Sequence, residues 1–133
     1  KWLYFGSNQR LENKKLSLVC PRQLDKFTVS ADNGNGKLTY PVGMITAEEM
    51  AYAGGVIWQT NTSYYLYNEV HSWSFSPSYF GRWGAGVFSL YSSGGFSDDV
   101  VSGLHGGRPV VSLKQGTVLS SGNGTSTSPF IVN

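Results

Sequence analysis

Three segments between residues 72 and 101 decide the fold: Ser72–Ser76 (SWSFS), Val87–Tyr91 (VFSLY) and Phe96–Val101 (FSDDVV). Each combines aromatic or β-branched residues with small polar ones, a composition that favours β-strands. Ser93-Gly94-Gly95 separates the second segment from the third, and glycines supply the positive φ angles that tight hairpin turns require. The stretch therefore predicts antiparallel strands connected by short turns.

One clear helix is expected before this strand-rich part, within Thr46–Gly55 (TAEEMAYAGG). Thr46 can cap the first turn, and Glu49, three residues later, can complete a capping box. The glycine pair at the end of the segment stops the helix. The carboxylates of Glu48 and Glu49 favour the positive end of the helix dipole, which explains their presence without catalysis.

Further short strands are predicted on both sides of the helix. They are Trp2–Phe5, Leu16–Val19, Phe27–Ser30, Lys37–Val42, Val56–Trp58, Tyr64–Tyr67, Arg108–Leu113 and Phe130–Val132. Residues 32–36 (DNGNG) are expected to close a hairpin between the strands that flank them, and residues 122–125 (GNGT) form a second turn. We therefore expect an α+β fold with mostly short antiparallel strands, one helix and long loops, including a long loop-rich excursion between Ser76 and Arg108.

The composition describes a single domain covering residues 1–133. A chain of 133 residues, 40% of them hydrophobic, can bury one sizeable core. Its net charge is +2 and its ten Lys and Arg are scattered, so we expect no nucleic-acid binding. No apolar run reaches the roughly 18 residues that a membrane-spanning helix needs, so we expect no membrane insertion by this segment. Because the chain begins at Lys1 rather than Met, we expect a fragment of a longer exported protein.

Motifs of common enzymes and metal sites are missing from the sequence. The serine-hydrolase motif G-x-S-x-G and the phosphate-binding loop G-x-x-x-x-G-K-[ST] do not occur. His71 and His105 are isolated and Cys20 has no companion at ligand spacing, so no metal or other cofactor is expected. Asp98-Asp99 is the most suggestive carboxylate pair, but neighbours on a strand face opposite ways and do not easily share a glycosidase site. We therefore expect no catalytic residues and no enzymatic activity.

One segment gathers the residue types that dominate binding hot spots. Residues 79–84 (YFGRWG) place three aromatics and an arginine in a glycine-flanked loop, and Tyr, Trp and Arg contribute most binding energy at interfaces. The alternative is that these aromatics fill the core beneath the loop. The residues expected to bind a ligand, the last two at the edges of the site, are Tyr79, Phe80, Arg82, Trp83, Asp98 and His105.

The order of segments in the second half resembles bacterial surface domains. HSWSFSPS (71–78), GAGVFSLYSSGG (84–95) and GRPVVSL (107–113) resemble segments in the C-terminal domains of bacterial collagen-like adhesins and in the Fibrobacter succinogenes major paralogous domain. LTYPVGMITAEE (38–49) and SGNGTSTSPFIV (121–132) resemble a domain of exported and pilin-like bacterial proteins. The resemblance covers roughly residues 38–133 and implies a C-type-lectin-like fold close to that of formylglycine-generating enzymes.

The sequence also departs from these relatives in ways that bear on function. Formylglycine-generating enzymes depend on paired cysteines, whereas Cys20 is alone and is either a buried thiol or the partner of a cysteine outside this chain. The Glu-Pro-Asn and Gln-Pro-Asp motifs of sugar-binding C-type lectins are absent. We expect an extracellular or cell-surface recognition or adhesion domain with a glycan or protein ligand, assembled into a pilus or larger surface protein. The alternatives are a phage or retroelement-diversified receptor-binding protein and an enzyme of unknown type.

Overall fold

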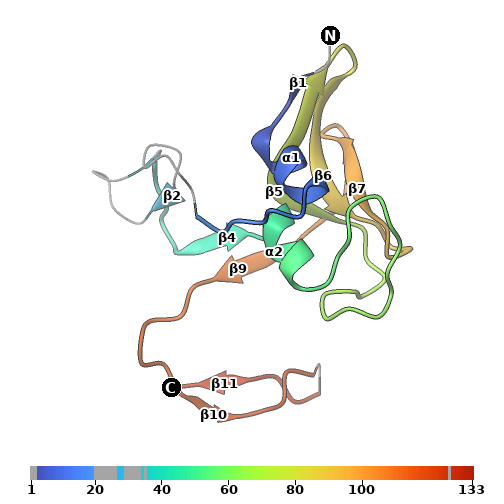
Figure 1. The fold of residues 1–133 in the computed structure, drawn as a ribbon. Helices are drawn as coiled ribbons and strands as arrows, with labels where there is room; N and C mark the ends of the chain where they lie inside the picture. Colours follow the sequence, from blue (N-terminus) through green and yellow to red (C-terminus); the bar gives the residue numbers. More distant parts are fainter. Residues whose placement is uncertain (1–2, 20–26, 29–33, 35, 126) are drawn as a thin grey trace.

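The computed structural model describes residues 3–19, 27–28, 34, 36–125 and 127–133 (Figure 1). Most strand pairs in this part of the chain are antiparallel and helices are few, which confirms the α+β class. In chain order the elements are β1 (Leu3–Tyr4), α1 (Gly6–Glu12), β2 (Phe27–Thr28), β3 (Gly36–Lys37), β4 (Val42–Met44), α2 (Ala47–Tyr52), β5 (Ser72–Gly81), β6 (Gly84–Leu90), β7 (Phe96–Val100), β8 (Gly106–Gly107), β9 (Pro109–Val111), β10 (Leu119–Ser121) and β11 (Ile131–Val132).

The main sheet is built around the long hairpin of β5 and β6. Its strand order is β1-β5-β6-β7, and β8 pairs with β5 in parallel. In Figure 1 this hairpin is the tallest part of the molecule, with β1 and α1 beside β5 and with β7 along β6. The turn between β6 and β7 uses Gly94 at a φ of +84°, as the glycines at 93–95 predicted.

The predicted loop-rich excursion between Ser76 and Arg108 is wrong, because β5, β6 and β7 occupy most of it. β5 runs on to Gly81, which pairs with Gly84 across a turn made by Arg82 and Trp83. Pro77 lacks a backbone N–H, and the register shifts on both sides of it. Such irregularities let a strand continue past a proline, and sequence composition alone does not reveal them.

Helix α1 was not predicted, because it carries no local helix signal. It has no side-chain cap and no acidic residue in its first turn. Contacts from distant parts of the chain stabilise it instead. The Ser7 hydroxyl donates to the backbone oxygen of Pro77 at 2.6 Å, and Leu11 is buried in the core. α1 therefore depends on β5 rather than on its own sequence.

Several predicted strands are irregular segments in the structure, namely 16–19, 56–58 and 64–67. Ile57 forms only an isolated bridge with Phe96, and Tyr64 is buried against the core. Packing against the core explains Ile57 and Tyr64 without strand pairing, whereas Leu18, Val19 and Tyr65 are exposed. The hairpin expected around 32–36 is also wrong, since β2 and β3 pair in parallel. The turn residues Asp32, Asn33 and Asn35, like Cys20, lie outside the described residues.

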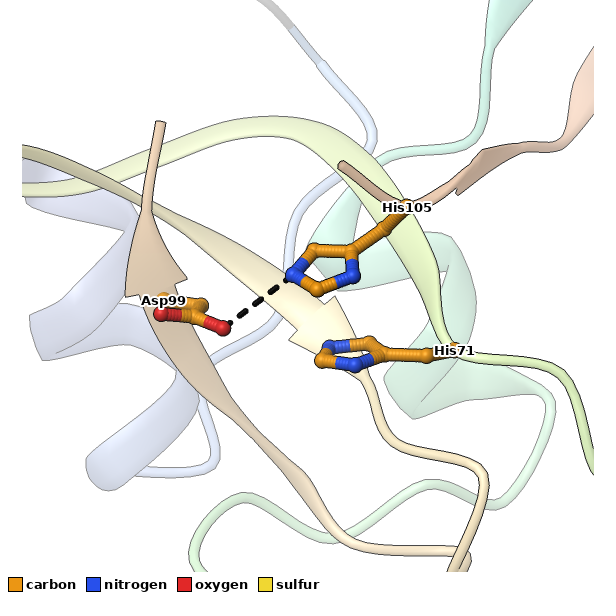
Figure 2. Close-up of side chains that lie close together, drawn as sticks. All are labelled: His71, Asp99 and His105. Carbon is orange, nitrogen blue, oxygen red and sulfur yellow. Dashed lines mark hydrogen bonds and ion pairs between the residues drawn. The ribbon is translucent and has the colours of Figure 1, made fainter. Parts of the chain in front are cut away.

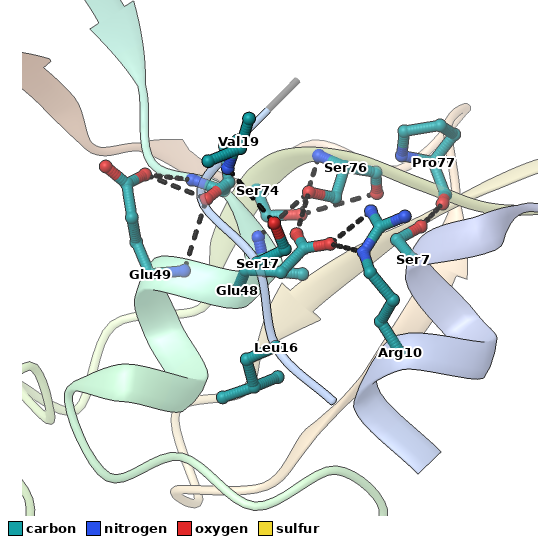
Figure 3. A network of polar contacts seen from close by, with 12 residues as sticks. Ser7, Arg10, Leu16, Ser17, Val19, Glu48, Glu49, Ser74, Ser76 and Pro77 are labelled. Carbon is teal, nitrogen blue, oxygen red and sulfur yellow. Dashed lines mark hydrogen bonds and ion pairs between the residues drawn. The ribbon is translucent and has the colours of Figure 1, made fainter. Parts of the chain in front are cut away.

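Helix α2 begins at the predicted capping box and joins a buried polar network. Glu49 N donates to Thr46 Oγ1 at 3.2 Å, and Glu49 Oε2 accepts from Thr46 N at 2.7 Å. Glu48, almost fully buried, forms an ion pair with Arg10 of α1 and accepts from Ser76 Oγ at 3.2 Å. Figure 3 shows that this network connects the two helices to β5.

The core lies between α2, β6 and β7, and β5 contributes serines to the interior. Ser72, Ser74, Ser76 and Ser78 are buried, whereas the residues between them are partly or fully exposed. Buried hydroxyls need hydrogen-bond partners, and each of these serines has one. The buried hydrophobic residues are Leu11, Ile45, Ala47, Met50, Tyr64, Phe88, Leu90 and Phe96.

The C-terminal part leaves the main sheet. β9 pairs antiparallel with β4, and the β10–β11 hairpin stands apart from the rest of the molecule in Figure 1. Its turn uses Gly122 at a φ of +93° and Gly124 at +81°, as the glycine-rich segment 122–125 predicted. Within the described residues, no helix is both long and apolar enough to cross a membrane.

Candidate functional site

A groove of about 650 Å³ lies where β1, α1, β5, β7 and the segment around residue 58 meet. Three aromatic rings and four polar side chains form its lining, a mixture typical of ligand sites. The lining residues are Tyr4, Asn8, Gln9, Glu12, Trp58, Tyr79 and Asp98.

Strand β1 brings the N-terminal residues to the groove. Tyr4 is paired with Tyr79 across β1 and β5, so the two side chains lie on the same side of the sheet. Phe5 N donates to Ser78 O at 2.9 Å, and α1 begins at the next residue. This connection places the start of α1, with Asn8 and Gln9, directly beside the two tyrosines.

Trp58 reaches the groove from a strained backbone conformation. Its φ is +62°, a region that non-glycine residues rarely adopt and that costs about 1–3 kcal/mol. Two hydrogen bonds to β7 hold the segment there, from Trp58 N to Phe96 O at 2.7 Å and from Phe96 N to Gln59 O at 3.1 Å. The indole is half exposed, and it also lines a second hollow of about 520 Å³ next to the groove. Strain of this kind concentrates at functional sites.

Tyr79 and Asp98 provide the polar side of the groove nearest the sheet. Asp98 accepts a hydrogen bond from Ser78 Oγ at 2.5 Å, which orients its carboxylate. Burial, followed by the charges of Asp98 and Asp99 and by Tyr4, raises the pKa of Tyr79, so its phenol keeps its proton and can donate. The ring of Tyr79 lies over Gly86, where an added Cβ would come within 2.2 Å of Tyr79 Cε1.

The structure separates the six predicted binding residues into three groups. Tyr79 and Asp98 line the groove. Phe80, paired with Leu3, is 56% exposed, and Trp83 at the hairpin tip is 72% exposed, so the core-filling alternative is wrong for both. The remaining two residues are Arg82, whose guanidinium lies 5.1 Å from the centroid of the Trp83 ring, and His105, which lies in a different cluster. A ligand role for Phe80, Arg82 and Trp83 stays a prediction.

Sequence reasoning missed five of the seven lining residues. Asn8, Gln9 and Glu12 were missed because α1 was not predicted. Tyr4 was missed because the pairing of its predicted strand with β5 was not foreseen. Trp58 was assigned to a strand. A polar, uncapped segment such as GSNQRLE directly after an aromatic strand candidate is only a weak local signal for this helix.

A second cluster contains His71, Asp99 and His105 (Figure 2). The interpretation that the two histidines are isolated is wrong, because their rings stack with centroids 3.6 Å apart. His105 Nε2 lies 3.2 Å from Asp99 Oδ2. Asp98 and Asp99 contact different partners, Ser78 and His105, as expected for neighbours on a strand.

Arg108 shows how the start of β9 is anchored to the main sheet. Its Nε donates to Ser72 Oγ at 3.1 Å, and its Nη2 donates to Asn68 Oδ1. Burial lowers the pKa of Arg108, with an opposing effect of Tyr64, but an arginine shifted in this way stays charged at neutral pH. Arg108 therefore stabilises the start of β9 through its hydrogen bonds with Ser72 and Asn68.

Comparison of the chain with models of protein families, with curated proteins and with solved structures found no match. The residues of the groove and of the histidine cluster are therefore the features from which a function can be inferred.

Proposed function

We propose that this chain is a non-catalytic extracellular recognition domain, C-type-lectin-like in architecture, that binds a glycan in the groove between β1, α1, β5 and β7. The observation that carries the proposal is the lining itself. Three aromatic rings, those of Tyr4, Trp58 and Tyr79, lie beside four polar side chains, those of Asn8, Gln9, Glu12 and Asp98.

The faces and the edges of a sugar ring are both complementary to this lining. Its faces carry C–H groups with a small positive charge, and the face of an aromatic ring is negative, so the two attract one another. Its edges carry hydroxyls that both donate and accept. Gln9, which is exposed, offers an amide that both donates and accepts, and the carboxylates of Glu12 and Asp98 accept. Asn8 is 3% exposed and contributes mainly to the floor of the groove.

The size of the surface favours a glycan of several sugars over a single one. The second hollow, of about 520 Å³, shares Glu12 and Trp58 with the groove, so the two form a continuous surface. Its other lining residues are mostly apolar, among them Leu11, Leu16 and Ile57. A chain of sugars could place one residue in the groove and the next against Trp58.

The extracellular and adhesive parts of the proposal rest on composition and resemblance. Charged residues make up only 14% of the chain, and the resemblance of residues 38–133 to surface domains of bacteria agrees with an exposed adhesin. The exposed β10–β11 hairpin carries Leu119, Ile131 and Val132 at its surface. Unpaired strand edges of this kind associate readily with other chains, which suits assembly into a pilus or a larger surface protein.

Two exposed aromatics allow a matched test of the groove. The purified wild-type chain is screened on a glycan array, and the best ligand is titrated into wild type, Tyr4→Ala and Trp83→Ala. Tyr4 lines the groove and Trp83 does not, while both side chains are more than 60% exposed. We expect Tyr4→Ala to weaken binding about thirtyfold, or about 2 kcal/mol, and Trp83→Ala to leave it unchanged, with similar melting temperatures for both.

Three results would overturn the proposal. Loss of binding in Trp83→Ala but not in Tyr4→Ala would move the site to the hairpin tip. Absence of any glycan among the array ligands, together with binding to a host protein, would change the ligand class. Release of a product from the bound glycan would make the protein an enzyme, with Glu12 and Asp98 as the first carboxylates to replace.

A further inference from the structure

His71, Asp99 and His105 lie close together on the face of β7 opposite to the groove residue Asp98. The register of the strands explains this arrangement. β5 and β8 pair in parallel with Ser72 opposite Gly106. His71 and His105 are the residues immediately before this pair, and Gly106 N donates to His71 O at 3.0 Å. The parallel register therefore places the two imidazoles side by side. Asp99, the neighbour of Asp98 on β7, completes the cluster.

We propose that His71, Asp99 and His105 form a binding site for a borderline divalent metal ion of the first transition row, with Zn²⁺ as its representative. Each residue offers one donor atom, and all three donor atoms lie within 4.8 Å of one another. Tetrahedral Zn²⁺ with bonds of 2.0–2.2 Å holds its ligand atoms about 3.3 Å apart. The 3.2 Å between His105 Nε2 and Asp99 Oδ2 already has this spacing, so only His71 has to approach.

The side chains are oriented for this role by contacts outside the cluster. Val100 N donates to Asp99 Oδ1 at 2.7 Å, which leaves Oδ2 directed at His105. The ring of Tyr91 stacks on His71 with centroids 4.2 Å apart, and His71 Nε2 lies 3.4 Å from Ser89 Oγ. Contacts of this kind fix ligand orientation in known metal sites.

The loop before β8 packs closely against the ring of His105. A Cβ added at Gly103 would lie 2.8 Å from His105 Nε2 and 3.4 Å from Trp73 Cζ2. The ring of Trp73 lies 4.4 Å from that of His105, between centroids. The imidazole is therefore held between the indole and the loop backbone, and its side chain is only 16% exposed.

The donor set selects the class of metal. Imidazole nitrogens suit Zn²⁺, Cu²⁺, Ni²⁺ and Co²⁺, whereas Ca²⁺ and Mg²⁺ prefer six or more oxygen ligands. Metal binding requires a neutral imidazole. The two imidazoles and one carboxylate of this cluster therefore favour Zn²⁺ and its neighbours in the first transition row.

The test is a calorimetric titration of the tag-free chain carrying Cys20→Ser, since a thiolate binds Zn²⁺ on its own and Cys20 lies outside the described residues. ZnCl₂ is titrated into this protein and into the same protein with His71→Ala, His105→Ala or Asp98→Asn. We expect one Zn²⁺ per chain with a Kd below about 10 µM. Either histidine variant should weaken binding at least about a hundredfold, because even the loss of an outer contact costs ten- to a hundredfold. Asp98→Asn, which changes the neighbouring carboxylate, should leave the affinity unchanged.

Each alternative outcome counts against the proposal. Absence of Zn²⁺ binding by the Cys20→Ser protein would refute the site regardless of the results for the variants. The cluster would then consist only of the stacked histidine rings and the His105–Asp99 ion pair. Equal affinities of the histidine variants would place the metal elsewhere, and CaCl₂ binding as tightly as ZnCl₂ would contradict the metal class. If a histidine variant fails to fold, the ring-nitrogen NMR signals of the unsubstituted histidines replace it as the measurement. Zn²⁺ must then shift the signals of both His71 and His105, and unchanged signals would refute the site.

Discussion

Trp58 allows the contribution of a side chain to binding to be separated from its contribution to stability. Its φ of +62° disfavours alanine by about 1–2 kcal/mol but not glycine. Trp58→Ala and Trp58→Gly remove the same indole, which is 51% exposed. Either variant therefore loses the burial of about 100 Å² of ring surface, which lowers the free energy of unfolding by about 2.5 kcal/mol. Alanine is normally more stable than glycine by about 0.5–1 kcal/mol. Here we expect the order to reverse, with Trp58→Gly more stable by about 0.5–1 kcal/mol.

The assay measures thermal unfolding and glycan affinity for both variants. The stability difference corresponds to a melting temperature about 2–4 °C higher for Trp58→Gly than for Trp58→Ala. The two affinities for the proposed glycan should nevertheless fall alike, about thirtyfold or more, because both variants lack the ring that we propose to contact the sugar. A more stable alanine variant would falsify the strained backbone at residue 58. Affinities equal to that of wild type would remove Trp58 from the site.

Three further predictions concern the supports of the two sites. Gly86→Ala should lower the melting temperature and weaken glycan binding, since its Cβ would collide with the Tyr79 ring, and an unchanged melting curve would contradict this packing. Glu48→Ala should lower the free energy of unfolding, measured in urea, by about 2–3 kcal/mol. This loss is smaller than that expected for a fully buried ion pair, because the partner Arg10 is 40% exposed. A loss under about 1 kcal/mol would show that the network contributes little. The lowered pKa of His71 means that the unfolded state binds more protons below the ordinary value of 6.5, so stability should fall as the pH drops below 6.5. His71→Gln should flatten that part of the pH profile, and identical profiles would refute a role of this ring.

Local sequence signals predicted the elements whose interactions are themselves local. The capping box of α2 joins Thr46 to a residue three positions later, so the motif alone is sufficient. The turns at 93–95 and 122–125 depend on glycines that adopt positive φ. The opposite directions of Asp98 and Asp99 follow from the alternation of side chains along a strand.

The groove and the histidine cluster could not be predicted in this way, because distant segments build them. α1 lacks a local cap and forms only where Ser7 and Leu11 meet β5 and the core. Without α1 the groove loses most of its polar lining.

The sequence by itself determined the α+β class, the capping box of helix α2 and the glycine turns at 93–95 and 122–125. Only the tertiary structure decided that β5 continues past Pro77, and that Trp58 joins Tyr4 in the groove. It also decided that His71 and His105, 34 positions apart, stack on one another. The physical reason is that strand register and side-chain burial depend on pairing between remote segments, and no local propensity specifies that pairing.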